Sequence, residues 1–249
     1  MIIDSHCHVG PAVQPGEYIP LGVSDGTLDR LMAYLEKHKI DMAGALPFIQ
    51  IGIDKANESV AEAVRKFPDK LIGFGTCNPW FKNAADTVRR SFEVLGLKGL
   101  KLHPFIHGYA LSSHTLTDPV YKVCADLGIP ILAHGGDDIF NHPYEFEEMA
   151  RVFPEVIQII GHMGSMYLCD QARLVAKRNK NIYLDTTAVF TGDIRMAVAE
   201  AGADKVIMGS DWPTGSTVVA IKKVNIAVAN QDHRNLILGS NMARIFGLT

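Results

Sequence analysis

The chain has 249 residues, and its 24 lysines and arginines against 27 aspartates and glutamates give a formal charge of −3. This balance excludes a basic nucleic-acid-binding protein on bulk electrostatics, and a content of 47% hydrophobic and 20% charged residues excludes a disordered chain. No apolar run approaches the roughly 18 residues that cross a bilayer, so we expect a globular protein without a membrane partner.

The first residues, Met1 to His6, lead into a strand-like segment without the basic, apolar and small-residue regions of a secretory signal. The four cysteines are spread along the chain without a CxxC pair, which is typical of reduced thiols. We therefore expect a cytoplasmic location.

Short, almost continuously apolar runs recur roughly 30 residues apart and predict strands that are buried on both faces. In chain order these runs are Ile2 to His6, Met42 to Pro47, Leu71 to Thr76, Leu97 to His103, Ile129 to His134, Val156 to His162, Ile182 to Thr186 and Val206 to Asp211. Segments with helical periodicity lie between them, as at Leu28, Leu31 and Leu35. This alternation predicts a parallel sheet with crossover helices.

Eight strand–helix units in 249 residues leave almost no chain for a second domain and match the number that closes a (β/α)8 TIM barrel. We therefore predict an α/β fold in which residues 1–249 form one domain. The alternative is an open doubly wound sheet, which usually carries a glycine-rich phosphate loop after its first strand. The sequence contains neither GxGxxG nor GxxxxGK[ST], which favours the barrel.

Polar residues collect where the predicted strands end, which in a barrel is the mouth that holds the chemistry. Five of the ten histidines and one aspartate occupy these ends: His6, His8, His103, His134, His162 and Asp211. A buried imidazole needs a partner, so this convergence indicates a metal. Because His6 and His8 are two residues apart on a strand, they point to the same face and can share one ion.

His134 and Asp211 would complete a set of three nitrogens and one oxygen, which suits Zn²⁺, with Mn²⁺ or another divalent ion as an alternative. Gly135-Gly136 follow His134 and would leave room for a ligand near the backbone. The competing interpretations are histidines satisfied inside the core and an Asp211 that caps a helix or turn. We assign His162 to catalysis rather than to the metal, because four ligands already leave space for water.

Lys101 and His103 alternate on the fourth strand, so both face the same side, and either could polarise a substrate. Lys101 could instead be carboxylated and bridge two metals, or it could be paired in the core. The segment Val9 to Gly26 combines prolines with glycines and predicts a lid in which Tyr18 faces the substrate. The alternative is a loop packed over the barrel rim.

Together these motifs resemble the amidohydrolase superfamily, specifically its amidohydrolase-related branch of metal-dependent TIM-barrel hydrolases and enzymes like aminocarboxymuconate-semialdehyde decarboxylase. The resemblance rests on Ile3 to His8, Gly99 to Pro104, Ile129 to Gly136, Gly161 to Gly164, Met208 to Pro213 and Leu238 to Gly247. It implies one divalent metal, usually zinc, held by His6, His8, His134 and Asp211, with His162 beside the metal-bound water. The chain is shorter than many members of the branch, which carry insertions between strands.

Two reactions on a small-molecule substrate suit such a site. In hydrolysis of an amide, lactone or ester, zinc lowers the pKa of bound water toward about 7, and Asp211 or His162 passes the proton to the leaving group. Non-oxidative decarboxylation of a small carboxylic acid needs a cation for the carboxylate. Lys101 could serve, but no arginine lies at a predicted strand end, which favours hydrolysis. A binding protein with a vestigial site is disfavoured because every ligand position is filled.

The oligomeric state is predicted from the resemblance and from the C-terminal stretch Leu236 to Leu248. Both indicate a homodimer, because the stretch is apolar and could form an interface. It could instead cover the barrel.

Overall fold

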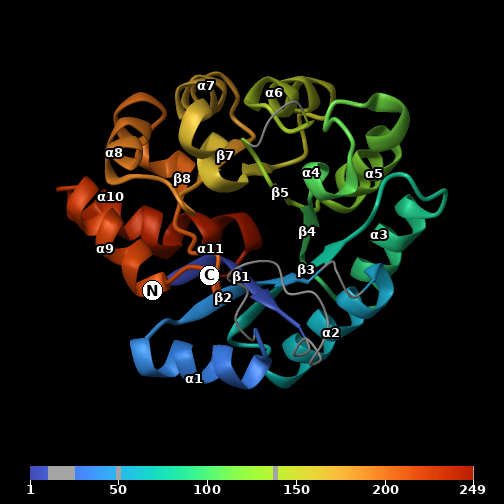
Figure 1. Cartoon of the computed structure of the whole chain (residues 1–249), viewed down its shortest axis with the longest axis horizontal. Helices are drawn as coiled ribbons and strands as arrows, with labels where there is room; N and C mark the ends of the chain where they lie inside the picture. The colour runs from blue at the N-terminus through green and yellow to red at the C-terminus, as the bar shows by residue number, and fades with distance from the viewer. Residues whose placement is uncertain (11–25, 49–51, 137–139, 249) are drawn as a thin grey trace.

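Figure 1 shows the computed structural model of the chain, which describes residues 1–10, 26–48, 52–136 and 140–248. Most of the predicted lid, including Tyr18, lies outside the described residues, so the lid stays a prediction. Within the described ranges, no helix has the length and apolar character that crossing a bilayer requires.

Eight parallel strands form one sheet in the order of the chain, β1 to β8. They are β1 (Ile3–Val9), β2 (Met42–Pro47), β3 (Leu71–Thr76), β4 (Gly99–Leu102), β5 (Ile131–Ala133), β6 (Gln158–Ile160), β7 (Ile182–Asp185) and β8 (Val206–Ile207). Each strand coincides with a predicted apolar run, and β2 and β3 have the predicted bounds. The predicted TIM-barrel fold is confirmed.

Hydrogen bonds between β1 and the segment after β8 close the sheet. The backbone N–H of Asp211 donates to the carbonyl of His6 at 2.8 Å, and the N–H of His8 donates to the carbonyl of Trp212 at 2.7 Å. Two regions at opposite ends of the sequence thereby become neighbouring strands. The closure itself places Asp211 beside the two histidines of β1.

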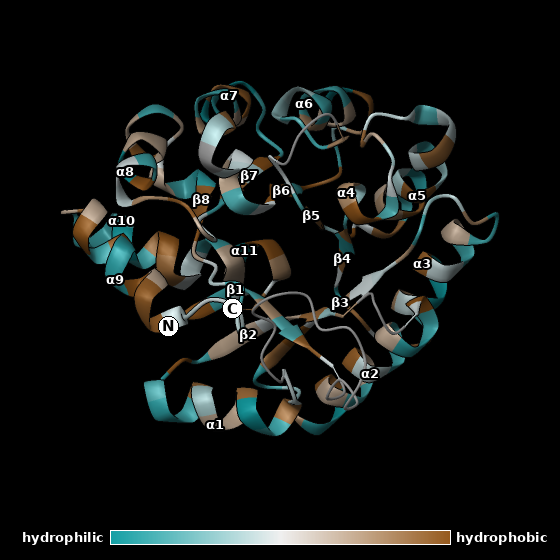
Figure 2. Cartoon of the chain, in the orientation of Figure 1, coloured by the Kyte–Doolittle hydropathy of each residue, from teal (hydrophilic) through white to brown (hydrophobic). Residues whose placement is uncertain are grey.

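Helices surround the barrel, and α11 lies toward its centre in the view of Figure 1. They are α1 (Leu28–His38), α2 (Ile53–Lys66), α3 (Ala84–Glu93), α4 (Pro104–His107), α5 (His114–Leu127), α6 (Pro143–Val152), α7 (Ser165–Arg178), α8 (Thr191–Glu200), α9 (Thr217–Ala227), α10 (Gln231–Asn235) and α11 (Asn241–Phe246). Figure 2 shows apolar stretches along these helices. In α2, for example, Ala56, Val60 and Ala63 are spaced i, i+4 and i+7 and are buried, so one face of the helix covers the strands.

Apolar side chains fill the barrel below its mouth. Ile3, Phe74 and Ile207 from three strands pack together with Met242 of α11, and the ring centroids of Phe74 and Phe246 lie 5.4 Å apart. The C-terminal stretch therefore covers the barrel, as one of the two interpretations of the sequence allowed. The homodimer therefore stays a prediction that rests on the resemblance alone.

Candidate metal centre and active site

A β-bulge in β1 sets the direction of His6. The pairing of β1 with β2 shifts register between Asp4 and Cys7, where β1 contains one extra residue. A bulge breaks strict alternation and can re-aim a side chain. As a result, the consecutive residues Ser5 and His6 both contact the carboxylate of Asp185, which regular alternation would prevent.

Asp185, at the end of β7, orients the ring of His6 through its Nδ1 atom. His6 Nδ1 lies 3.0 Å from Asp185 Oδ2, and both side chains are buried. A carboxylate only accepts, so in the neutral ring Nδ1 carries the proton and Nε2 keeps a lone pair. Burial and the nearby Lys101 lower the pKa of His6 to about 4, against the opposing effect of Asp185, so the ring is neutral at pH 7.

His8 and Asp211 complete the group around Nε2 of His6. Asp211 Oδ1 lies 3.2 Å from His8 Nε2 and 3.5 Å from His6 Nε2. His8 Nδ1 is 3.4 Å from the carbonyl of Pro47, an acceptor to which the ring can donate from Nδ1 when Nε2 binds a metal. Burial alone would raise the pKa of the Asp211 carboxyl, but the His8 hydrogen bond and the nearby His6 hold it well below its usual range.

These three side chains fit a divalent metal. One ligand atom from each of His6, His8 and Asp211 lies within 4.8 Å of the other two. Two imidazole nitrogens with a carboxylate oxygen are typical ligands of catalytic zinc, and each histidine has the outer hydrogen bond that usually fixes a metal-binding ring. The donor set and its surroundings therefore fit a divalent metal, while zinc in particular stays a prediction.

Lys101 lies inside the barrel beside this group. Its side chain is buried, and its Nζ is 3.3 Å from His6 Nε2. Burial lowers the pKa of Lys101 to about 8, although Asp211 and Asp185 act in the opposite direction. Of the three interpretations of Lys101, this contact matches a lysine paired inside the barrel. The carboxylated bridge and the substrate contact stay predictions.

Three more predicted residues, His103, His134 and His162, line the same cavity. The rings of His103 and His134 stack with centroids 4.0 Å apart, and the His134 and His162 centroids are 4.4 Å apart. His134 does not belong to the compact donor group formed by described residues. Its role as the third nitrogen ligand is therefore still a prediction.

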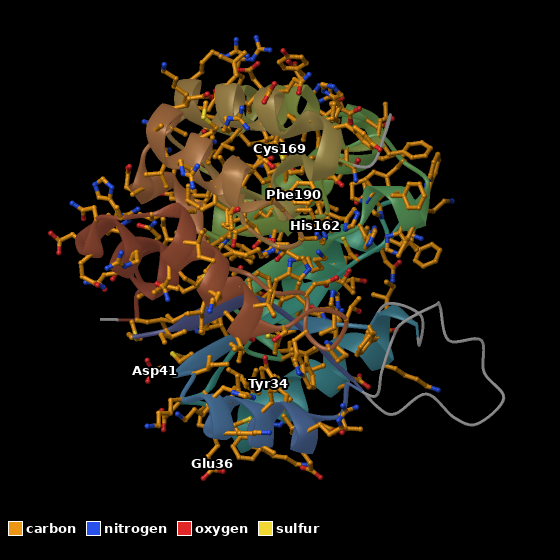
Figure 3. All side chains as sticks on the ribbon, turned by 60° about the vertical axis from the view of Figure 1, so that its left-hand side comes forward. Tyr34, Glu36, Asp41, His162, Cys169 and Phe190 are labelled. Carbon is orange, nitrogen blue, oxygen red and sulfur yellow. The ribbon has the colours of Figure 1, made fainter. Side chains whose placement is uncertain are left out.

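His162 lies in a strained segment that follows β6 and is labelled in Figure 3. His162 and Met163 have φ values of 58° and 48°, which non-glycine residues rarely adopt. The backbone N–H of His162 donates to Asp185 Oδ2 at 3.3 Å and helps hold this conformation. Burial and the neighbouring His134 lower the pKa of His162 well below its usual value, so its ring is neutral. Strain of this kind concentrates at functional sites.

The cavity at this mouth has a volume of about 190 Å³. Pro47, Phe48, Ile106 and Thr214 line it together with Lys101, Asp211 and the five histidines. A cavity of about 150 Å³ holds benzene, so one small ring with short substituents fits here. No described residue of the lining is an arginine.

Comparison with known proteins agrees with this geometry. The amidohydrolase family model matches residues 3–248, nearly the whole chain. The chain belongs to the amidohydrolase family. The resemblance inferred from its motifs is thereby confirmed.

Several solved structures share the fold of this amidohydrolase. An uncharacterised TIM-barrel protein from Bordetella bronchiseptica is 18% identical with a TM-score of 0.82, covering 99% of this chain and 98% of that chain. The 5-carboxyvanillate decarboxylase of Sphingomonas paucimobilis is 18% identical with a TM-score of 0.75, covering 100% and 99%. A probable 2-pyrone-4,6-dicarboxylic acid hydrolase from Acinetobacter baumannii is 18% identical with a TM-score of 0.72, covering 99% of each chain.

By their names these relatives include a decarboxylase and a probable hydrolase. The comparisons therefore support an enzyme of the amidohydrolase family and are compatible with both reactions expected from the sequence. The choice between the reactions depends on this chain's own residues.

The glycines after His134 serve a different purpose from the expected one. Gly136 has a φ of 88°, and a Cβ atom on it would overlap the backbone of Gly164. A Cβ on Gly135 would lie 2.7 Å from the side chain of Ile160. The two glycines therefore let the loops after β5 and β6 approach each other, rather than leaving room for a ligand.

Asp185 was not among the residues predicted from the sequence. This buried carboxylate accepts hydrogen bonds from the hydroxyls of Thr187 at 2.9 Å and Ser5 at 3.3 Å, besides its contact with His6. A Cβ on Gly209 would overlap it, so the packing there is tight. The signal was present, because Asp185 ends the seventh strand as Asp211 follows the eighth.

A second buried carboxylate, Asp4, fixes the loop that carries Asp211. It accepts hydrogen bonds from the backbone N–H of Ser210 at 3.0 Å and from the hydroxyl of Thr217 at 2.5 Å. Burial raises the pKa of Asp4 to about 6, although these hydrogen bonds act against it. Asp4 thus links β1 to the segment after β8 and supports the metal centre indirectly.

Proposed function

We propose that this amidohydrolase is a metal-dependent hydrolase of a small amide, lactone or ester. The observation that carries the proposal is the convergence of His6 Nε2, His8 Nε2 and Asp211 Oδ1 beside a cavity sized for one small ring. A divalent metal bound there, zinc or alternatively manganese, would supply Lewis-acid activation of water and of the scissile carbonyl. His134 would be its further ligand.

The residues around this centre can move the proton that hydrolysis requires. The carboxylate of Asp211 and the neutral ring of His162 are both unprotonated at pH 7, the state in which either can take a proton from the attacking water. The same group would then return the proton to the leaving nitrogen or oxygen.

His103 is suited to orient the substrate. Its Nδ1 accepts the backbone N–H of Ile106 at 3.4 Å, at the start of α4. In the neutral ring Nε2 therefore carries the proton and can donate to a substrate oxygen. Burial and the stacked His134 hold the pKa of His103 far below its usual value, so the ring stays neutral and acts as a donor without a charge.

Decarboxylation is the second candidate, because the buried Lys101 lines the cavity and a cation there could seat a carboxylate. Hydrolysis is favoured over it, because no described lining residue is an arginine.

One screen separates the two reactions. Purified protein supplied with Zn²⁺ or Mn²⁺ is incubated with small lactones, amides, esters and aromatic carboxylic acids, while the carboxylate product and CO₂ are measured in the same vessel. Hydrolysis forms a new carboxylate without CO₂. Release of one CO₂ for each substrate consumed would establish decarboxylation and overturn the proposal.

Two variants test the roles of the residues on any substrate that is hydrolysed. Asp211→Asn should lower kcat by about 10²-fold or more, because it removes a proton acceptor and weakens a metal ligand. The matched control is Asp118→Asn, whose carboxylate pairs with His114 on the surface. Equal activity of both variants would contradict the role of Asp211.

A further inference from the structure

A second cavity, of about 230 Å³, adjoins the catalytic cavity at the carboxyl ends of β7 and β8. Asp211 and Thr214 line both cavities, so the two cavities are neighbours that share part of their lining. The second cavity is also lined by Ala188 after β7, by Ser216 and Val219 at the start of α9, and by Lys223 on the same helix. Neither the metal centre nor the proposed hydrolysis gives this space a use.

Lys223 supplies a positive charge to this cavity. Its side chain is half-buried, and Nζ donates to the carbonyl of Val189 at 2.9 Å. Val189 precedes Phe190, which is labelled in Figure 3. Among the described residues, that carbonyl is the only acceptor within hydrogen-bonding distance of Lys223. An ammonium has three N–H donors, so two are available for a ligand.

The residues around the second cavity have features that are typical of a ligand-binding site. Ala188 and Asp211, which line it from the two loops, have φ values of 61° and 64°, a conformation that costs a non-glycine residue free energy and that is frequent at ligand sites. The first turn of α9 adds the partial positive charge of a helix N-terminus. The Ser216 hydroxyl, 3.0 Å from Tyr34 Oη, supplies a further polar group.

We propose that Lys223 and this second cavity bind an anionic group of the substrate, a carboxylate or a phosphate, next to the bond that is hydrolysed. The inference rests on the proposed function and narrows its substrate class to small amides, lactones or esters that carry such a group. Because the two cavities share Asp211 and Thr214, a substrate with its scissile carbonyl at the metal centre can place a neighbouring anion against Lys223.

The competing role of Lys223 is purely structural. Its ammonium could balance the buried charge of Asp185, which opposes the lowering of the Lys223 pKa by burial. A structural role predicts lower stability when Lys223 is replaced. It predicts no change in anion binding by the folded protein.

The first test measures binding of inorganic phosphate by isothermal titration calorimetry to the full chain after metal removal with a chelator. Lys223→Met should weaken phosphate binding about tenfold or more, because a charge-assisted hydrogen bond is lost. Lys223→Arg should bind within a few-fold of the wild type. The matched control is Lys222→Met, which removes the same charge from the exposed neighbouring residue and should bind like the wild type.

Two results of this titration overturn the proposal. One is phosphate binding by Lys223→Met equal to that of Lys222→Met, which would place the anion elsewhere. The other is no phosphate binding by the wild type at millimolar concentrations. Circular dichroism of each variant ensures that only folded protein is compared.

The second test uses a pair of substrates with the same scissile bond, with and without an additional carboxylate. Lys223→Met should raise KM about tenfold for the acid and leave KM of the neutral substrate unchanged. Inorganic phosphate should compete with the acidic substrate. If phosphate binds through Lys223 but does not compete with the acidic substrate, the second cavity is a site for a free anion. That result would overturn the proposal that it binds the substrate. If no substrate is hydrolysed, the proposed function is overturned. The phosphate titration of Lys223→Met would still show whether Lys223 binds an anion.

Discussion

Replacing Asp185 with asparagine should weaken metal binding although Asp185 is not a metal ligand. Asp185 Oδ2 accepts from His6 Nδ1 at 3.0 Å and from the backbone N–H of His162 at 3.3 Å. Asp185 Oδ1 accepts from the backbone N–H of Thr187 at 3.3 Å and from two hydroxyls, those of Thr187 and Ser5. An asparagine has one acceptor oxygen instead of two, so its amide group must face at least one N–H donor.

The less costly orientation gives the size of the effect. In this orientation the asparagine NH₂ group takes the place of Asp185 Oδ1. The hydroxyls of Ser5 and Thr187 can rotate and accept hydrogen bonds from it, so only the backbone N–H of Thr187 faces another donor. His6 keeps a neutral acceptor, but a hydrogen bond to a charged group is worth about 1.5–3 kcal/mol against about 0.5–1.5 for a neutral one. Loss of such an outer partner typically lowers metal affinity 10–100-fold, which corresponds to about 1.4–2.7 kcal/mol.

The assay is a competition titration of Zn²⁺ between the protein and a chelator of known affinity. Asp118→Asn is the matched control, because Asp118 Oδ1 also lies 2.8 Å from a histidine Nδ1, that of His114, but on the surface. The control should bind Zn²⁺ like the wild type. A zinc Kd for folded Asp185→Asn within twofold of the wild type would refute the role of Asp185 in orienting His6.

Three further predictions concern the rest of the molecule. Gly136→Ala should lower the free energy of unfolding in urea by at least about 2 kcal/mol more than Gly96→Ala does. Both glycines have positive φ, but only at Gly136 would the new Cβ atom overlap the backbone of Gly164. Equal losses in the two variants would contradict this packing. The four buried cysteines should react slowly with a thiol reagent at pH 8 until the protein unfolds. Burial raises the pKa of Cys77 and Cys169 to about 12, which leaves about one of these thiols in 10⁴ ionised at pH 8. Rapid reaction of the native protein would contradict this prediction. Sedimentation should show a homodimer, as the resemblance to the amidohydrolase superfamily implies, and a single species near 27.2 kDa would refute it.

The barrel could be predicted because its strands are buried on both faces and appear as continuous apolar runs. The bounds of β2 and β3 agree with the sequence for this reason. β8 has only two residues, because the chain after Ile207 leaves the sheet ladder to reach β1 and Asp4. That departure depends on side chains far away in the sequence, so no local pattern reveals it.

Within the site, the sequence placed His6, His8 and Asp211 together because the carboxyl ends of barrel strands meet at one mouth. It could not give the orientation of His6, which depends on a bulge whose extra residue leaves no mark in the run Ile2 to His6. The pairing of Lys101 with His6 is likewise a matter of distance across the barrel. Alternation along the strand predicts that Lys101 points into the barrel, but it does not predict that His6 is its partner.

The most direct test of the metal centre is the metal content of the purified chain by mass spectrometry after incubation with Zn²⁺ and removal of free ions. The wild type and His233→Ala, which replaces an exposed histidine outside the site, should each hold about one zinc per chain. His6→Ala should hold less than about a tenth of that, because a ligand is lost at a site with few ligands. Full zinc content in folded His6→Ala, or none in the wild type, would contradict the assignment of this mouth of the barrel as a metal centre.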